Sequence, residues 1–481
     1  MENLKLFQLL EKFSKQELKS LGNFVRSPYF NTKKESIVLF DFLEKYYPDF
    51  SNAKLTYEAM FAAIYPQQKL NIKKLSYVIS YLSQLCEKFI ATEQLFKHPF
   101  QSEIARLTYF AEIELEIGFN KSQRELEKNL EQFPYRNAEY YYYNYQLQQL
   151  KQKYQSRAQN HHNEDILQNT MDQLDFYYLC DKLRLASEML NRQNIVAVDY
   201  KMNLLEEIMQ VLHKKTIQNP LLIIYYNLLL CLQYPEEESH FSNLLENLTL
   251  YSQTTDPIEA RQLYLLAVNY GVLKAQEGNL AYLQKILNIQ QEMLDRNLIY
   301  DEKGYLSQWS YTNFVRLNAR LGHIDAAFVF VDKYKHKLPP DQRDNAYNFN
   351  LAYVLTQSKA LHKAQLLLNE VVFDDVFYFC EAKVMLLQIY YLLEQINPLL
   401  SLLDSFRVYL GRNALISQIK KEAYVNFVKI IGKLVKIYDN DKTALLKIKT
   451  EIANTRRLVG AMWLTDRINE KLYTIQGNAP D

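Results

Sequence analysis

The sequence predicts an all-α protein whose C-terminal half is built from stacked helix pairs. Three observations support this fold class. Glycine (10) and proline (12) are scarce among 481 residues, whereas a β protein of this size needs many such residues in its turns. Apolar residues recur at helical spacing along the chain. In the C-terminal half one apolar pattern returns at steps of 35 to 44 residues, the length of a helix hairpin.

The composition indicates a folded protein without a strong electrostatic preference for any partner. Hydrophobic residues make up 48% of the chain, so long disordered stretches are not expected. The 56 Lys and Arg balance 55 Asp and Glu, which leaves no overall field that would attract nucleic acid or an anionic membrane. The four cysteines form no CxxC pair and are expected to be buried, reduced thiols. They are Cys86, Cys180, Cys231 and Cys380.

Neither a secretory signal nor a membrane span is expected. The first apolar stretch is interrupted by Glu2, Lys5 and Glu11, unlike the apolar core of a signal peptide. The most apolar segment, Leu221 to Leu232, is well short of the roughly 20 residues that cross a bilayer. We therefore expect a cytoplasmic protein with no membrane partner.

Residues 1–95 predict an N-terminal helical module of four short helices. Ser14 with Glu17 fits a capping box that starts a helix at the next residue, and Thr32 with Glu35 fits a second one. In each case the serine or threonine oxygen accepts from a backbone amide at the helix start. These signals predict the first two helices of the module.

Two further helices are expected at 56–65 and after Asn71. The second would carry Lys73 and Lys74 at its N-terminal end, after a turn through Pro66. Two short helices so connected are similar to a helix-turn-helix, in which the start of the second helix contacts bases. This arrangement keeps a DNA-binding role open for the N-terminal module.

Residues 96–235 continue as helices with irregular repeats, broken near Pro134 and before Pro220. The run Tyr140–Tyr145 is the oddest feature here. Such rings either form an aromatic groove for a partner peptide or pack between helices, and we expect packing. The adjacent pair His161-His162 lacks the i, i+4 spacing of metal ligands on a helix, so a solvated linker is expected.

From 236 to 410 an apolar set of the form i, i+3, i+6, i+7 recurs. It starts at Leu280, Ile324, Leu361 and Ile396, and an earlier copy at Phe241 lacks only the i+6 member, which is Asn247. Helix pairs are therefore expected there, with turns near 278, 322, 359 and 395. Two of the turns carry glycine, Gly278 and Gly322, where a helix commonly ends in a left-handed residue.

The segment Leu321–Ala327, which reads LGHIDAA, resembles the turn and second-helix start of a tetratricopeptide repeat. This resemblance implies a TPR-like α-solenoid of helix hairpins over about residues 236–410. Ala327 and Ala364 would then be the small residues that allow helices to approach closely. Residues 411–481 would supply C-terminal capping helices and a short tail.

The sequence carries none of the common motifs for catalysis. The phosphate-binding patterns GxxxxGK[ST] and GxGxxG are missing, as are GxSxG and HExxH. No acid, base and nucleophile can be assigned together, so neither an enzyme nor a cofactor or metal site is expected.

The leading hypothesis is a non-catalytic scaffold that binds a protein or peptide through the concave face of the solenoid. Five residues on the first helices of the pairs are candidates for this groove: Tyr311, Phe314, Tyr347, Asn350 and Tyr390. The alternative is a transcriptional or signalling regulator that joins the helix-turn-helix-like module to a repeat sensor domain. Nucleic acid is not expected as a partner of the whole chain. It stays open for residues 1–95, where Lys and Arg outnumber Asp and Glu.

Overall fold

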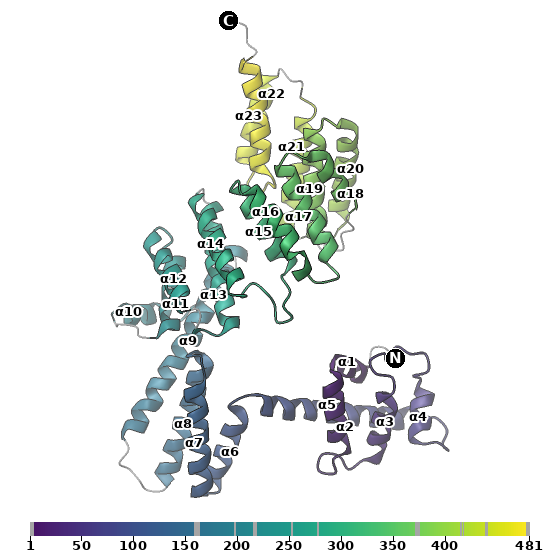
Figure 1. Ribbon diagram of the computed structural model, residues 1–481, viewed down its shortest axis with the longest axis vertical. Coiled ribbons are helices and arrows are strands. Elements are labelled where there is room, and N and C mark those ends of the chain that lie inside the picture. The colour runs from purple at the N-terminus through teal and green to yellow at the C-terminus, as the bar shows by residue number, and fades with distance from the viewer. Residues whose placement is uncertain are drawn as a thin grey trace. The chain divides into compact units, whose positions relative to one another are not determined.

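The computed structural model describes residues 4–157, 164–196, 199–214, 219–251, 254–276, 279–370, 376–413, 416, 418–437 and 441–477. Over these ranges the regular structure is helical, and the only β pairing is an isolated bridge between Tyr300 and Leu306. The all-α prediction is thus confirmed. The chain divides into two compact units, Met1–Lys182 and Leu183–Asp481 (Figure 1).

The first unit holds eight complete helices among its described residues, and a ninth continues into the second unit. They are α1 (Lys5–Lys12), α2 (Lys15–Arg26), α3 (Lys34–Glu44), α4 (Tyr57–Ile64), α5 (Ile72–Lys97), α6 (Gln101–Glu112), α7 (Glu116–Gln132), α8 (Ala138–Arg157) and α9 (Glu164–Val196).

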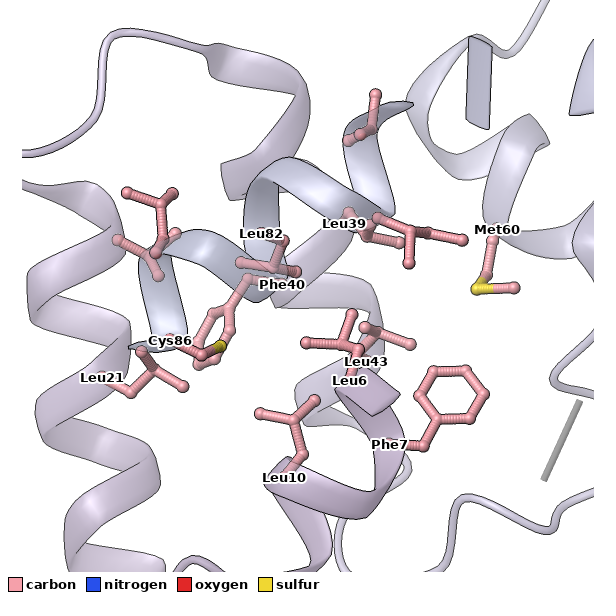
Figure 2. Packing of buried hydrophobic residues seen from close by; sticks show 14 of the residues in the cluster. Leu6, Phe7, Leu10, Leu21, Leu39, Phe40, Leu43, Met60, Leu82 and Cys86 are labelled. Atoms are coloured by element: carbon pink, nitrogen blue, oxygen red, sulfur yellow. The ribbon is translucent and has the colours of Figure 1, made fainter. Parts of the chain in front are cut away.

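Helices α1 to α5 enclose one hydrophobic core, which Figure 2 shows from close by. Leu21, Leu39 and Leu82 meet there and are fully buried. The long α5 contributes an apolar stripe at steps of three and four residues, as its sequence predicts. A separate core joins α6, α7 and α8 around Leu126 and Leu147.

The predicted helix starts in this module are confirmed at three of four positions. Ser14 and Glu17 form a complete capping box, while Thr56 and Asn71 cap α4 and α5 through their side chains. The second capping box is wrong, because α3 starts at Lys34 and Thr32 makes no cap. The buried Asn31 makes the side-chain hydrogen bond at this turn instead, because its side-chain oxygen accepts from the Lys33 amide at 2.9 Å.

Helix α1 was not among the four predicted helices. It has no side-chain cap, so no sequence signal marks its start. Its three buried residues, Leu6, Phe7 and Leu10, are held by the shared core instead. Tertiary packing therefore stabilises this helix.

The described helices of the second unit follow the end of α9. They are α10 (Leu205–Lys214), α11 (Pro220–Gln233), α12 (Glu238–Tyr251), α13 (Pro257–Gln276), α14 (Ala281–Asp295), α15 (Gln308–Arg320), α16 (Ile324–Tyr334), the 3-10 helix η2 (Lys335–Lys337), α17 (Arg343–Gln357), α18 (Leu361–Glu370), α19 (Val376–Leu392), α20 (Ile396–Arg412), α21 (Gln418–Leu434), α22 (Lys442–Asn454) and α23 (Ala461–Gly477).

Consecutive helices of this unit pack in pairs: α11 with α12, α13 with α14, α15 with α16, α17 with α18, and α19 with α20. The helix breaks lie at the predicted turns near 278, 322, 359 and 395. Gly278 itself lies outside the described residues. The first helices also contact one another, because α15 packs on α17 and α17 on α19.

Three of these turns end their first helix in the same way. A left-handed residue follows the helix at Gly322 (φ 84°), Lys359 (φ 62°) and Glu394 (φ 55°). In each turn, amides of the left-handed residue and of its successor donate back to the last helical carbonyls, as in a Schellman motif. The glycine signal predicts the first turn, while the lysine and glutamate carry no such signal.

Among the described helices, none combines the length with the apolar character that a bilayer crossing requires. All four cysteines are buried, as predicted.

Candidate partner-binding face

The five predicted groove residues do not line one open surface. Tyr311 and Phe314 are buried between α15 and α16, where the Tyr311 hydroxyl donates to the Val331 carbonyl at 2.7 Å. Phe314 stacks on the Phe330 ring at a centroid distance of 4.0 Å. These two side chains join the helices of one pair, and in this structure they are inaccessible to a partner.

Asn350 is also fully buried, so it belongs to the interior as well. The other two residues are half-buried. The Tyr347 hydroxyl donates to Asp332 on α16 at 2.8 Å, and Tyr390 packs against the cores on both sides of α19. Binding of a peptide by Tyr347 or Tyr390 stays a prediction.

Asn350 forms part of a polar row that crosses three first helices. Its side-chain amide donates to Thr312 on α15 at 3.0 Å and to the Ala346 carbonyl at 2.8 Å. The Thr312 hydroxyl in turn contacts the hydroxyl of Tyr378 on α19. Tyr378 also donates to the Gln308 carbonyl at 2.9 Å. These buried bonds align α15, α17 and α19 with one another.

About one helical turn along the same helices lies a second row, which is partly open to solvent. Arg316 of α15 forms an ion pair with Glu381 of α19, with 2.9 Å between Nη2 and Oε2. Their side chains remain 33% and 25% exposed. The Arg316 guanidinium also lies over two rings of α17, at 5.5 Å from the centroid of Phe349 and 5.3 Å from that of Tyr353.

The second row extends to α21 through Tyr424. Its hydroxyl donates to the other oxygen of Glu381 at 2.8 Å. Burial raises the pKa of Tyr424 far above its usual value, and the Glu381 carboxylate raises it further. The hydroxyl therefore stays protonated and acts as a donor. Together, Arg316, Tyr353, Glu381 and Tyr424 define what we call the first-helix row.

Arg320 lies one turn beyond Arg316 on α15 and is exposed. It is close enough to Tyr353 to counteract, together with Arg316, the rise that burial causes in the pKa of that hydroxyl. Among the described residues Arg320 has no carboxylate partner, unlike Arg316. This part of the face therefore presents an exposed positive charge.

The sequence carries a local signal for this row. Arg316 and Arg320 stand four residues apart, as do Phe349 and Tyr353, so each pair shares one helix face. Of the side chains predicted from the sequence, Tyr311, Phe314 and Tyr347 contact the second helix α16 instead, while Asn350 lies in the buried polar row. The error is one of helix rotation, which local spacing alone does not define.

The tyrosine run of α8 serves packing, as expected. Tyr141 stacks on Phe176 of α9 at 5.0 Å, Tyr142 lies 5.2 Å from Tyr177, and Tyr143 is buried in the core of α6 to α8. His161 and His162 lie outside the described residues. Within the described ranges, no three His, Cys, Asp or Glu side chains are grouped as a metal site would need.

The two helices that were compared with a helix-turn-helix are α4 and α5, and residues 65–71 connect them. This connection is longer than the three or four residues of that motif. Lys73 is exposed, whereas the Lys74 ammonium lies over the Tyr65 ring. Comparison of the chain with models of known protein families and with curated proteins finds no match to either.

Proposed function

We propose that the protein is a non-catalytic helical-repeat scaffold that binds another protein or a peptide segment across α15, α17, α19 and α21. The observation that carries the proposal is the first-helix row, which joins side chains of α15, α17, α19 and α21. A partly exposed row of rings and charges offers a partner both apolar contact and hydrogen bonds. Tyrosine and arginine are favoured in such contacts.

We further infer that the helix pairs are tetratricopeptide-like repeats stacked as a solenoid. The pairing of consecutive helices and the turn positions support this. So does the complete burial of Ala327 and Ala364, since small residues let helices approach closely. The burial of all four cysteine thiols supports a reducing, cytoplasmic location.

The partner should carry acidic side chains next to apolar ones. Arg320 has no carboxylate to pair with among the described residues, and its charge acts on the Tyr353 hydroxyl. An acidic residue of a partner would pair with Arg320, and an apolar neighbour would cover the ring.

Affinity capture from lysate of the source cells, followed by mass spectrometry, tests this proposal. Wild-type protein is compared with Arg320→Glu and with the matched control Lys363→Glu, which makes the same charge change at an exposed position of the second helix α18. We expect a partner that wild type and the control retain and that Arg320→Glu loses. Equal retention by all three proteins would place the binding surface elsewhere.

A further inference from the structure

A cavity of about 340 Å³ lies in the N-terminal module, between the start of α3, the end of α4 and α5. Its lining combines three tyrosines, Tyr65, Tyr77 and Tyr81, with two lysines, Lys33 and Lys74. Pockets for small ligands begin at about this volume, at roughly 300 Å³. The cavity is therefore large enough for one small ligand.

Both lysines are positioned by aromatic rings. The Lys33 ammonium lies 4.3 Å from the ring centroid of Tyr77 and 4.1 Å from that of Tyr81, and it donates to the Tyr77 hydroxyl. The Lys74 ammonium lies 3.6 Å from the centroid of Tyr65 and donates to Gln68 at 3.1 Å. Ring contacts fix where the charges lie without neutralising them.

Neither ammonium group forms an ion pair with a carboxylate of the described residues. Other lysines of the same module do, for example Lys5 with Glu87 at 2.5 Å. One carboxylate, Glu35, also lines the cavity, so the lining carries two positive charges and one negative charge. The cavity thus has a net attraction for a compact anion.

The chemistry of the lining selects among anions. Lysine binds phosphate as a point charge, whereas phosphorylated peptides are usually held by the fork of arginine. The cavity is lined by lysine and not by arginine. Tyr77 is 62% exposed, so part of its ring is open to solvent, and every nucleobase can stack on such a surface.

We propose that this cavity binds a single nucleotide, with its monoester phosphate at Lys33 and Lys74 and its base against the tyrosine rings. The nucleotide is either free or the 5′-phosphorylated end of a single strand, since both present the same groups. This site is independent of the partner-binding face proposed for the second unit.

Isothermal titration calorimetry on the full-length protein tests the site, with AMP, adenosine and inorganic phosphate as probes. We expect saturable binding of AMP with a Kd below about 1 mM near 150 mM salt, and binding at least about tenfold weaker for the other two probes. A 5′-phosphorylated oligonucleotide and its 5′-hydroxyl form identify the source. Preference for the phosphorylated strand over AMP assigns a strand end, and the reverse assigns a free nucleotide.

Variants distinguish binding in the cavity from a general attraction of AMP to positive charges on the protein surface. Lys33→Ala with Lys74→Ala should weaken AMP binding at least about tenfold, because both phosphate contacts are removed. The matched control, Lys34→Ala with Lys73→Ala, changes two exposed neighbours outside the cavity and should stay within about twofold of wild type. Tyr77→Leu should weaken AMP binding more than inorganic phosphate binding, because it removes a ring surface for the base as well as the hydroxyl that accepts from Lys33.

Three results would overturn the proposal. One is no saturable AMP binding by the wild-type protein, and another is an equal loss in both double variants. The third is binding of phosphotyrosine without binding of AMP, which would make the cavity a phosphopeptide site. Circular dichroism of each variant checks that its helices are intact.

Discussion

At the residue scale, the start of α2 shows a sequence signal and its structural outcome in full agreement. The Ser14 amide donates to the Glu17 carboxylate at 2.8 Å, and the Glu17 amide donates to the Ser14 hydroxyl at 3.2 Å. Each bond satisfies a backbone amide that the helix itself leaves unpaired. At the start of α3, Thr32 and Glu35 have the same spacing without these bonds.

We therefore expect Ser14→Ala to lower the free energy of unfolding by about 1 kcal/mol, the usual cost of losing an N-cap. Thr32→Ala is the matched control and should change it by less than about 0.5 kcal/mol. Urea denaturation followed by circular dichroism measures both. Equal costs would mean that Thr32 also caps its helix in solution.

The same capping box predicts a dependence on pH. The hydrogen bond from the Ser14 amide is the largest cause that lowers the pKa of Glu17. A carboxyl group with a lowered folded-state pKa stabilises the protein above its unfolded pKa of about 4.3, and this contribution is lost as the pH falls through the folded value.

The cost of Glu17→Ala should therefore be larger at pH 7 than at pH 3. Gln16→Ala, which removes no ionisable group, should cost the same at both values. Denaturant titrations at the two pH values provide the comparison. A pH-independent cost of Glu17→Ala would contradict the lowered pKa.

At the scale of elements, the helix ends of the second unit use one geometry with different residues. Gly322 adopts a left-handed φ of 84°, and a side chain added there would meet nothing within 4 Å. The cost of a substitution would therefore come from the backbone alone. Lys359 and Glu394 adopt the same left-handed conformation in the equivalent turns, with the backbone strain that it causes.

Gly322→Ala should destabilise the protein by about 1 kcal/mol, because alanine is strained in the left-handed region. Gly411→Ala makes the same change inside α20, also with nothing within 4 Å, and should stabilise by up to about 1 kcal/mol. Thermal unfolding of both variants tests the opposite signs. If both variants shifted the melting temperature in the same direction, backbone strain at Gly322 could not explain the effect.

The pairing of α15 with α16 depends on a small residue at their contact. Ala327 is completely buried, so Ala327→Leu should force neighbouring side chains apart and cost about 1 to 3 kcal/mol. The neighbouring Ala326 is exposed, and Ala326→Leu should change stability by less than about 0.5 kcal/mol. If thermal unfolding of the Ala327 variant matched the parent, the tight contact would be disproved.

At the scale of the whole molecule, the charge balance limits what the protein binds. With 56 basic and 55 acidic residues, the chain has almost no net charge with which to neutralise a series of phosphates. A single nucleotide in the cavity of the N-terminal module needs two lysines only. Duplex DNA would have to contact many more basic side chains.

We expect full-length protein to bind a labelled random duplex more weakly than about 1 μM near 150 mM salt, as measured by fluorescence anisotropy. Titrations at several salt concentrations give the slope that reports phosphate contacts. Tighter binding with a steep slope would favour the DNA-binding regulator over the interaction scaffold.

What the sequence determined about this protein is local. Caps at Ser14, Thr56 and Asn71, together with the turn at Gly322, depend on residues a few positions apart, so they were readable without a structure. The helical class follows from the scarcity of turn residues and from the apolar spacing, which are also properties of short segments.

Only the tertiary structure decided which face of each helix points where. Arg316 and Glu381 are 65 positions apart, and no spacing rule joins them. The contact exists because α15, α17 and α19 pack side by side with a particular rotation. The same rotation buries Tyr311 and Asn350. Each helix contacts several neighbours, and its rotation is set by packing against all of them together.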